Sequence, residues 1–92
     1  MGYDIELTED AEHTLRKLTK SNREMARRIN RELGALGAED NPRRFVSQLN
    51  GHYPPYYSLH VGDFRVIMRI YDDRLVIVVV DLGPRKTIYR DY

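Results

Sequence analysis

The sequence contains no cysteine and no long run of apolar residues. Without cysteine, a disulfide, a thiolate metal site and a cysteine nucleophile are all excluded. The first residues are acidic and lack the apolar core of a signal peptide, and no stretch is long enough to span a bilayer. We therefore expect a protein of the reducing cytoplasm that is not inserted in a membrane.

The net charge of the chain is small, at +1, but the charges are unevenly placed. Residues 1–15 carry acidic side chains and no lysine or arginine, whereas residues 16–31 carry arginine and lysine against the single acid Glu24. This basic stretch is either a solvated helix face or a surface that meets a polyanion or an acidic protein.

Residues 1–37 predict a strand followed by a helical hairpin. Apolar residues alternate with acids from Tyr3 to Leu7, as in a half-buried strand. Thr8 can cap a first helix, the segment 21–24 (SNRE) resembles a capping box that begins a second, and Gly37 can end it. The residues expected to form the apolar helix stripes are Ala11, Leu15, Leu18, Met25, Ile29, Leu33 and Leu36.

The rest of the chain predicts a loop and then three strands. Residues 37–55 are rich in turn signals, and alternating patterns follow at 57–61, 64–71 and 74–81. The segment from Leu75 to Val80 is apolar at every position, which predicts a central strand covered on both faces. A chain of 92 residues makes one domain, 1–92. The predicted fold class is α+β, with the order β-α-α-β-β-β: a helical hairpin on a small antiparallel meander.

Two segments near the end of the chain carry candidate chemistry. Arg65 follows a Gly-Asp turn at the start of a predicted strand, and Arg85 precedes Tyr89 after the last strand. If these strands are neighbours, the three side chains converge at one end of the sheet. Two cations can offset charge on a phosphate during transfer, and a tyrosine can stack on a base or move a proton.

Those segments, behind a helical hairpin, resemble the RelE/ParE toxin superfamily of toxin–antitoxin modules. The similarity is sharpest in 59–67 (LHVGDFRVI), 82–85 (LGPR) and 88–89 (IY) and extends over nearly the whole chain. By this resemblance, RelE-type members cut messenger RNA in the ribosomal A site, using the 2′-hydroxyl of the RNA itself and no metal or other cofactor. ParE-type members share the fold but poison DNA gyrase and lack the nuclease residues.

The resemblance also implies roles for particular residues. Arg65 and Arg85 match arginines that stabilise the scissile phosphate, and Tyr89 matches a tyrosine that stacks on the nucleotide. Tyr56 and Ser58 stand where RelE has a pair of lysines, and His60 stands where a basic residue, commonly arginine, precedes the valine. Further candidates for RNA binding are Arg69, Lys86, Ser58 and Tyr56.

His60 is the candidate general base, because histidine titrates near neutral pH and can accept the 2′-hydroxyl proton. Histidines occur at 13, 52 and 60, a spacing that does not fit a zinc site, so no metal is expected. Simpler interpretations stay open. His60 can be an exposed residue of a sheet edge, Arg65 can pair with Asp63 or Asp81, and Tyr89 can be a core residue.

The predicted function is therefore that of a toxin acting as a ribosome-dependent, metal-independent endoribonuclease. The predicted partners are the ribosome, messenger RNA and a cognate antitoxin with an acidic helix that covers the helical hairpin. The alternatives are a ParE-like or catalytically degenerate toxin that acts by binding a protein, and a non-catalytic module that binds RNA or the ribosome. Tyr92, as the last residue of this sequence, is expected to be frayed.

Overall fold

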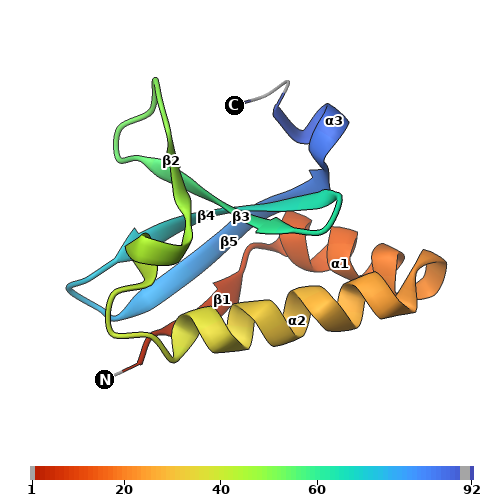
Figure 1. The fold of residues 1–92 in the computed structure, drawn as a ribbon, viewed down its shortest axis with the longest axis horizontal. Coiled ribbons are helices and arrows are strands. Elements are labelled where there is room, and N and C mark those ends of the chain that lie inside the picture. Colours follow the sequence, from red (N-terminus) through yellow and green to blue (C-terminus); the bar gives the residue numbers. More distant parts are fainter. Residues whose placement is uncertain (1, 90–91) are drawn as a thin grey trace.

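The computed structural model describes residues 2–89 and residue 92, and shows an α+β fold of two layers (Figure 1). A helical hairpin packs against one face of a five-stranded sheet. The elements along the chain are β1 (Asp4–Leu7), α1 (Glu9–Ser21), α2 (Arg23–Gly37), a 3-10 helix η1 (Pro42–Phe45), β2 (Ser47–Leu49), β3 (Tyr56–Val61), β4 (Phe64–Tyr71), β5 (Val76–Pro84) and α3 (Arg85–Ile88).

The sheet has the strand order β1-β5-β4-β3-β2. Strands β3, β4 and β5 form the predicted antiparallel meander. The sheet as a whole is mixed, because β1 pairs with β5 in parallel, with Ile5 opposite Ile77. The short strand β2 lies within the segment predicted to be a loop and pairs with β3. The fold class is thus confirmed, and the sheet is larger than the sequence predicts.

Both helices begin at polar side chains that cap their first turns. Thr8 Oγ1 accepts a hydrogen bond from the backbone N–H of Ala11 at 3.2 Å, as predicted. Asn22 Oδ1 accepts one from the N–H of Met25 at 3.2 Å. The cap of α2 is therefore Asn22 rather than Ser21, because Ser21 still belongs to α1. Gly37 is the last residue of α2, where the sequence predicts its end.

The core lies between the hairpin and the sheet. Ile29 and Leu33 of α2 are buried against Val61, Val66 and other apolar residues that point to the helical side of β3, β4 and β5. Leu15 and Met25 belong to the predicted stripes but are only partly buried at the edge of this cluster. The apolar stripes of the helices, with period 3.6, and the apolar faces of the strands, with period 2, therefore pack together in one core layer.

The prediction that β5 is covered on both faces is wrong. Val78 and Val80 are only half-buried, because the helices cover one face of the sheet. The other face is covered at one end by α3, where a Cβ on Gly83 would lie 3.2 Å from Ile88 Cδ1. We call this second face the open face.

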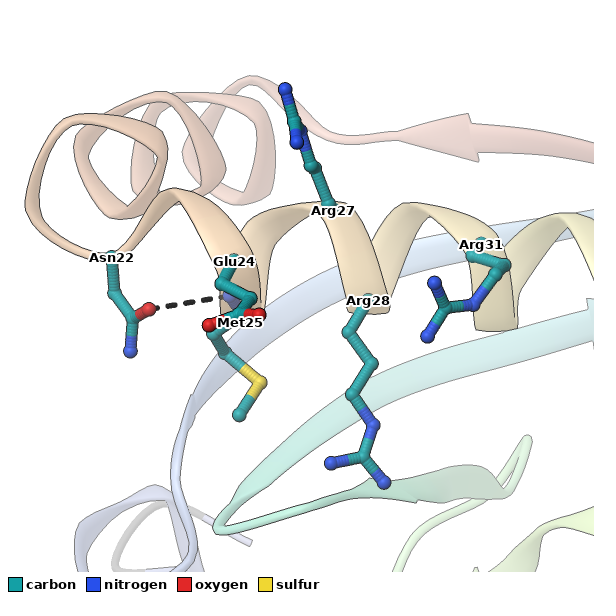
Figure 2. A pocket seen from close by; sticks show the side chains of 6 residues that line it. All are labelled: Asn22, Glu24, Met25, Arg27, Arg28 and Arg31. Carbon is teal, nitrogen blue, oxygen red and sulfur yellow. Dashed lines mark hydrogen bonds between the residues drawn. The ribbon is translucent and has the colours of Figure 1, made fainter.

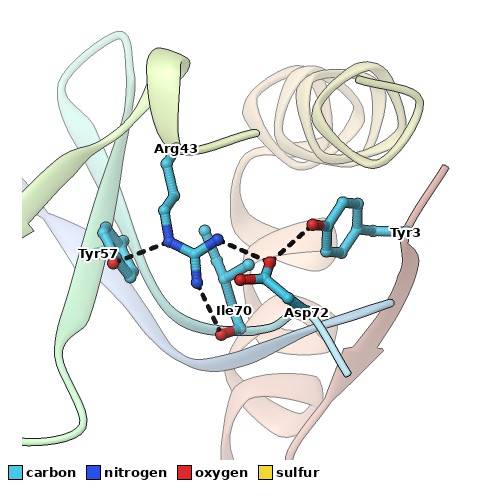
Figure 3. A network of polar contacts seen from close by, with 5 residues as sticks. All are labelled: Tyr3, Arg43, Tyr57, Ile70 and Asp72. Atoms are coloured by element: carbon cyan, nitrogen blue, oxygen red, sulfur yellow. Dashed lines mark hydrogen bonds and ion pairs between the residues drawn. The ribbon is translucent and has the colours of Figure 1, made fainter. Parts of the chain in front are cut away.

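A polar network holds η1 and β1 to the far end of the meander (Figure 3). Arg43 donates hydrogen bonds to Tyr57 Oη at 3.0 Å, to Ile70 O at 3.2 Å and to Asp72 Oδ1 at 2.7 Å. Tyr3 Oη donates to the same Asp72 oxygen at 2.7 Å. The hydrogen bond from Arg43, helped by that from Tyr3, lowers the pKa of Asp72.

Candidate functional site

The open face gathers polar residues from neighbouring strands. Side chains alternate along a strand, so the residues between the core positions of β3 and β4 point to the open face. The register places His60 opposite Arg65, Ser58 opposite Ile67, and Ile67 opposite Asp81. The shared face of His60 and Arg65, on which the proposal of a histidine base depends, is thus present in the structure.

Arg65 is half-buried beside Tyr89. Its guanidinium carbon lies 5.8 Å from the centre of the Tyr89 ring, at the limit of a cation–π contact. Its Nε is buried and has no hydrogen-bond partner among residues 2–89 and 92. Within the same residues the structure shows no ion pair of Arg65 with Asp63 or Asp81. The guanidinium is therefore held in place with hydrogen-bonding capacity that the described residues do not use.

Tyr89 is fixed by Ser58. The two hydroxyl oxygens lie 2.9 Å apart, and Ser58 is almost fully buried. Tyr89 itself follows the last residue of α3 and is 37% exposed, so it is not a core residue. Ser58 thus acts on the open face as a positioning residue for the Tyr89 ring.

Arg69 lies four residues beyond Arg65 along β4, on the same face. Its guanidinium carbon stacks 4.3 Å from the centre of the Tyr56 ring. Its Nε is also buried without a partner in the part of the chain that the structure describes. Among those residues, Arg65 and Arg69 are the side chains that show this feature. The open face therefore presents two guanidinium groups, each beside a tyrosine.

His60 is exposed, and its ring makes one defined contact. Nε2 lies 2.6 Å from the carbonyl oxygen of Gly62. Since a carbonyl oxygen can only accept, Nε2 carries the proton of that hydrogen bond. In the neutral ring, Nδ1 is then the nitrogen that can accept a proton from a substrate.

Arg85 and Lys86 begin α3 and are both exposed. They line a hollow of about 450 Å³ with Asp63 and Pro84, and the Arg85 N–H donates to Asp63 O at 2.7 Å. Gly83, two residues earlier, is the register partner of Arg65. Arg85 therefore lies at the same end of the sheet as Arg65 and Tyr89, but its side chain makes no contact with either that the structure records for the described residues.

Sequence reasoning named Tyr56 as a candidate but missed that Asp81 and Tyr92 meet beside it on the open face. Asp81 accepts hydrogen bonds from the backbone N–H of Leu82 at 2.8 Å and from Tyr92 Oη at 3.2 Å. The Tyr92 ring packs edge-on against Tyr56, with centroids 5.2 Å apart, and His52 packs against Tyr56 at 4.9 Å. Tyr92 is therefore packed rather than frayed. The available signal was Asp81, an acid that interrupts an apolar strand.

A basic groove lies on the helical side of the molecule (Figure 2). It has a volume of about 500 Å³ and is lined by Asn22, Glu24, Met25, Arg27, Arg28 and Arg31 of α2 and its cap. Arg28 points toward the β3–β4 turn, where a Cβ on Gly62 would lie 3.1 Å from Arg28 Nη1. Gly62 has a φ of +58°, so both backbone and space favour glycine there. We name this surface the basic groove.

The described residues contain neither a candidate metal site nor a membrane-spanning helix. Within 2–89 and 92, no three side chains of His, Asp or Glu are grouped so that they could hold a metal ion. In the same part of the chain, none of the helices combines the length and the apolar character needed to cross a bilayer.

Comparison with solved structures places this fold among toxins. RelE in the archaeal RelE–RelB complex from Pyrococcus horikoshii OT3 is 28% identical, with a TM-score of 0.71, over 95% of this chain and 99% of that one. A chain of the toxin–antitoxin complex RelBE2 from Mycobacterium tuberculosis is 23% identical, with a TM-score of 0.67, over 92% and 100%. A mutant of E. coli toxin RelE in the free state is 19% identical, with a TM-score of 0.74, over 96% and 88%.

Comparison of sequences identifies the family. No curated protein matches the chain. The sequence model described as the ParE toxin of the type II toxin–antitoxin system parDE matches residues 5–89, nearly the whole chain. The chain therefore belongs to the ParE toxin family of type II toxin–antitoxin systems, within the RelE/ParE superfamily.

Proposed function

We propose that this toxin is an endoribonuclease that cleaves messenger RNA in the ribosomal A site and so inhibits translation in the cytoplasm. The observation that carries the proposal is the pair of guanidinium groups on the open face, Arg65 and Arg69, whose buried Nε atoms have no partner among the described residues. A buried donor without a partner costs about 1–3 kcal/mol. Phosphate oxygens supply acceptors that arginine binds strongly.

The reaction that fits these groups is transfer of the phosphate within the RNA. The 2′-hydroxyl attacks the adjacent phosphorus, the bond to the 5′-oxygen of the next nucleotide breaks, and the products are a 2′,3′-cyclic phosphate and a 5′-hydroxyl. The proton of the 2′-hydroxyl leaves to a base, and the departing 5′-oxygen takes up a proton. Arg65 stabilises the negative charge on the phosphate oxygens during this transfer.

His60 is the proposed base. It shares the face of Arg65 directly across the β3–β4 ladder, and its Nδ1 is the free acceptor when Nε2 donates to Gly62. Tyr89, held by Ser58 beside Arg65, offers its partly exposed ring to a nucleobase. Arg85 supplies a second cation from the same end of the sheet, and Lys86 next to it adds attraction for the backbone.

The shape of this site supports the proposed dependence on the ribosome. The candidate groups lie on an open sheet face, and the hollow beside Arg85 is lined only by Asp63, Pro84, Arg85 and Lys86 among the described residues. Such a surface holds few contacts that orient a flexible RNA, and orientation supplies a large part of the rate in a phosphoryl transfer. The ribosome presents the A-site codon in a fixed path and provides that orientation.

A second candidate function is inhibition of DNA gyrase by protein binding. The family match over residues 5–89 is to ParE toxins, and Tyr56 and Ser58 occupy the positions of the lysine pair that the nuclease resemblance implies. In this alternative the basic groove or the open face binds a protein, and the two arginines perform no chemistry.

The proposed antitoxin carries an acidic amphipathic segment that binds in the basic groove. Arg27, Arg28 and Arg31 line the groove, and Met25 adds apolar surface to it. The archaeal relative is a RelE in complex with RelB, which supports a partner of the antitoxin class. Steering by these arginines predicts faster association at low ionic strength. An on-rate that does not change between low and high salt would place the antitoxin elsewhere.

The nuclease proposal is tested in a purified translation system with mapped messenger RNA ends. The expected result is arrested translation with cuts at the A-site codon, slow cutting of the same RNA without ribosomes, and no effect on supercoiling by purified gyrase. Arg65→Met is the inactive control, and Arg74→Met is the matched control, because Arg74 also stacks on a tyrosine but follows β4 at its opposite end. Uncut RNA together with inhibited gyrase would establish the second candidate instead.

A further inference from the structure

The ring of Tyr92 lies against the open face in the manner of a bound nucleobase. It forms a T-shaped contact with the Tyr56 ring at a centroid distance of 5.2 Å, and the centre of the His52 ring lies 6.1 Å from it. Its hydroxyl group donates to Asp81 Oδ2 at 3.2 Å. A planar ring with a hydrogen-bond donor on its rim therefore occupies a place built from aromatic side chains and a carboxylate.

The carboxylate of Asp81 is oriented to accept a hydrogen bond from a group on the open face. It sits half-buried on β5 opposite Ile67, and its Oδ1 is fixed by the N–H of Leu82 at 2.8 Å. Oδ2 faces the Tyr92 hydroxyl. A carboxylate only accepts hydrogen bonds when ionised, so a ligand in this place must present N–H or O–H groups.

We infer that His52, Tyr56 and Asp81 form a subsite for a guanine base, which Tyr92 occupies when RNA is absent. The inference rests on the proposed function, since it assigns part of the RNA that the open face would bind. Guanine presents two adjacent donors, N1–H and N2–H, on its Watson–Crick edge. In adenine, cytosine and uracil a ring or carbonyl acceptor lies next to the donor, and it repels a carboxylate.

The neighbouring residues fit a nucleotide in this subsite. The Tyr56 ring provides an aromatic contact of the kind it makes with Tyr92, and such contacts are tolerant of base identity, so selection falls to Asp81. Arg69 lies over Tyr56 at 4.3 Å with its Nε unpaired among the described residues, so it is the cation that would bind the attached phosphate. Binding must displace the Tyr92 ring, and the Tyr92–Asp81 hydrogen bond therefore weakens the affinity for guanine.

The test is an NMR titration of the intact chain with each of the four ribonucleoside 5′-monophosphates, followed at the Leu82 amide and the His52 ring. Guanosine monophosphate should bind about fivefold or more tightly than the other three, the lower end for a bidentate contact to one base. Asp81→Asn should abolish that preference. Tyr92→Phe should tighten guanosine monophosphate binding, because it removes the competing hydroxyl and keeps the ring.

Matched controls are available on the same chain. Asp73→Asn changes an exposed acid in the β4–β5 turn, and Tyr53→Phe changes a tyrosine that is 97% exposed; neither should alter the titration. Equal binding of all four nucleotides, or a guanine preference that survives Asp81→Asn, would overturn the inference. The readout needs no ribosome and no cleavage. A toxin without nuclease activity can still show the guanine preference, and a nuclease can lack it, so the two proposals fail separately.

Discussion

Arg65→Met separates a functional arginine from a structural one. Methionine keeps much of the length and the apolar stem of the arginine side chain on β4, and removes the guanidinium. If Arg65 stabilises the phosphate in the transition state, cleavage should fall by about 10²–10³, the loss typical for one such donor. The free energy of unfolding should not fall, because the guanidinium makes no ion pair that the structure records in residues 2–89 and 92.

The size of the stability effect follows from two contacts. The buried Nε without a partner destabilises the folded state by about 1–3 kcal/mol, and methionine removes that cost. The cation–π contact with Tyr89, at 5.8 Å, is worth about 0.5–1 kcal/mol and is lost. The expected result lies between no change and a gain of about 2.5 kcal/mol, so the variant should be inactive yet at least as stable.

Two assays on the same preparation decide the matter. Urea unfolding measures the free energy of unfolding, and the rate of messenger RNA cleavage on stalled ribosomes measures function. Arg74→Met, at an exposed arginine stacked on Tyr71, should leave both quantities unchanged. A variant at Arg65 that loses more than about 1.5 kcal/mol of stability while it keeps its cleavage rate would refute the reasoning.

Four further predictions concern other residues. Arg43→Met should lower the free energy of unfolding, measured in urea, by about 1.5–3 kcal/mol without changing ribosome binding. The reason is that it removes three hydrogen bonds and leaves the Tyr57 hydroxyl unpaired. A smaller loss of stability than in Arg65→Met would contradict this. The folded-state pKa of Asp72 is lowered, so its contribution to stability is present at neutral pH and is lost as the pH falls below about 4, and Asp72→Asn should flatten the stability profile there. Arg85→Ala should lower cleavage by about 10²–10³ with the fold intact by circular dichroism, and His60→Gln should lower it by about 10²–10⁴ with ribosome binding retained; unchanged rates would return either side chain to the exposed surface.

Much of the fold could be predicted from local patterns. Alternation in 64–71 and helical spacing in α2 reflect which side of each element is buried, and Thr8 and Gly37 mark real helix ends. The parallel pairing of β1 with β5 could not be predicted, because Ile5 and Ile77 are far apart in sequence and both patterns fit several registers. The apolar run of β5 led to the wrong prediction that both faces of the strand are covered. Val78 is apolar but only half-buried, because the helical hairpin covers one face of the sheet.

The candidate site could likewise be predicted only in part. That Arg65 and Tyr89 meet could be predicted, because both follow from the pairing of adjacent strands and a short turn into α3. The contact between Asp81 and Tyr92 could not, since the two residues are 11 positions apart and no local sequence pattern links them. Arg85 was expected to converge on the same point, but the turn of α3 directs its side chain to the hollow beside Asp63.

The central claim is that the 2′-hydroxyl of messenger RNA attacks the phosphate held by Arg65. It is tested most directly by programming ribosomes with a message that carries one 2′-deoxynucleotide on the 5′ side of the mapped A-site cut. The account predicts that this message is bound but not cut there, whereas the all-ribose message yields a 2′,3′-cyclic phosphate and a 5′-hydroxyl end. Cleavage of the deoxy-substituted message at the same bond, or no cleavage of either message, would contradict it.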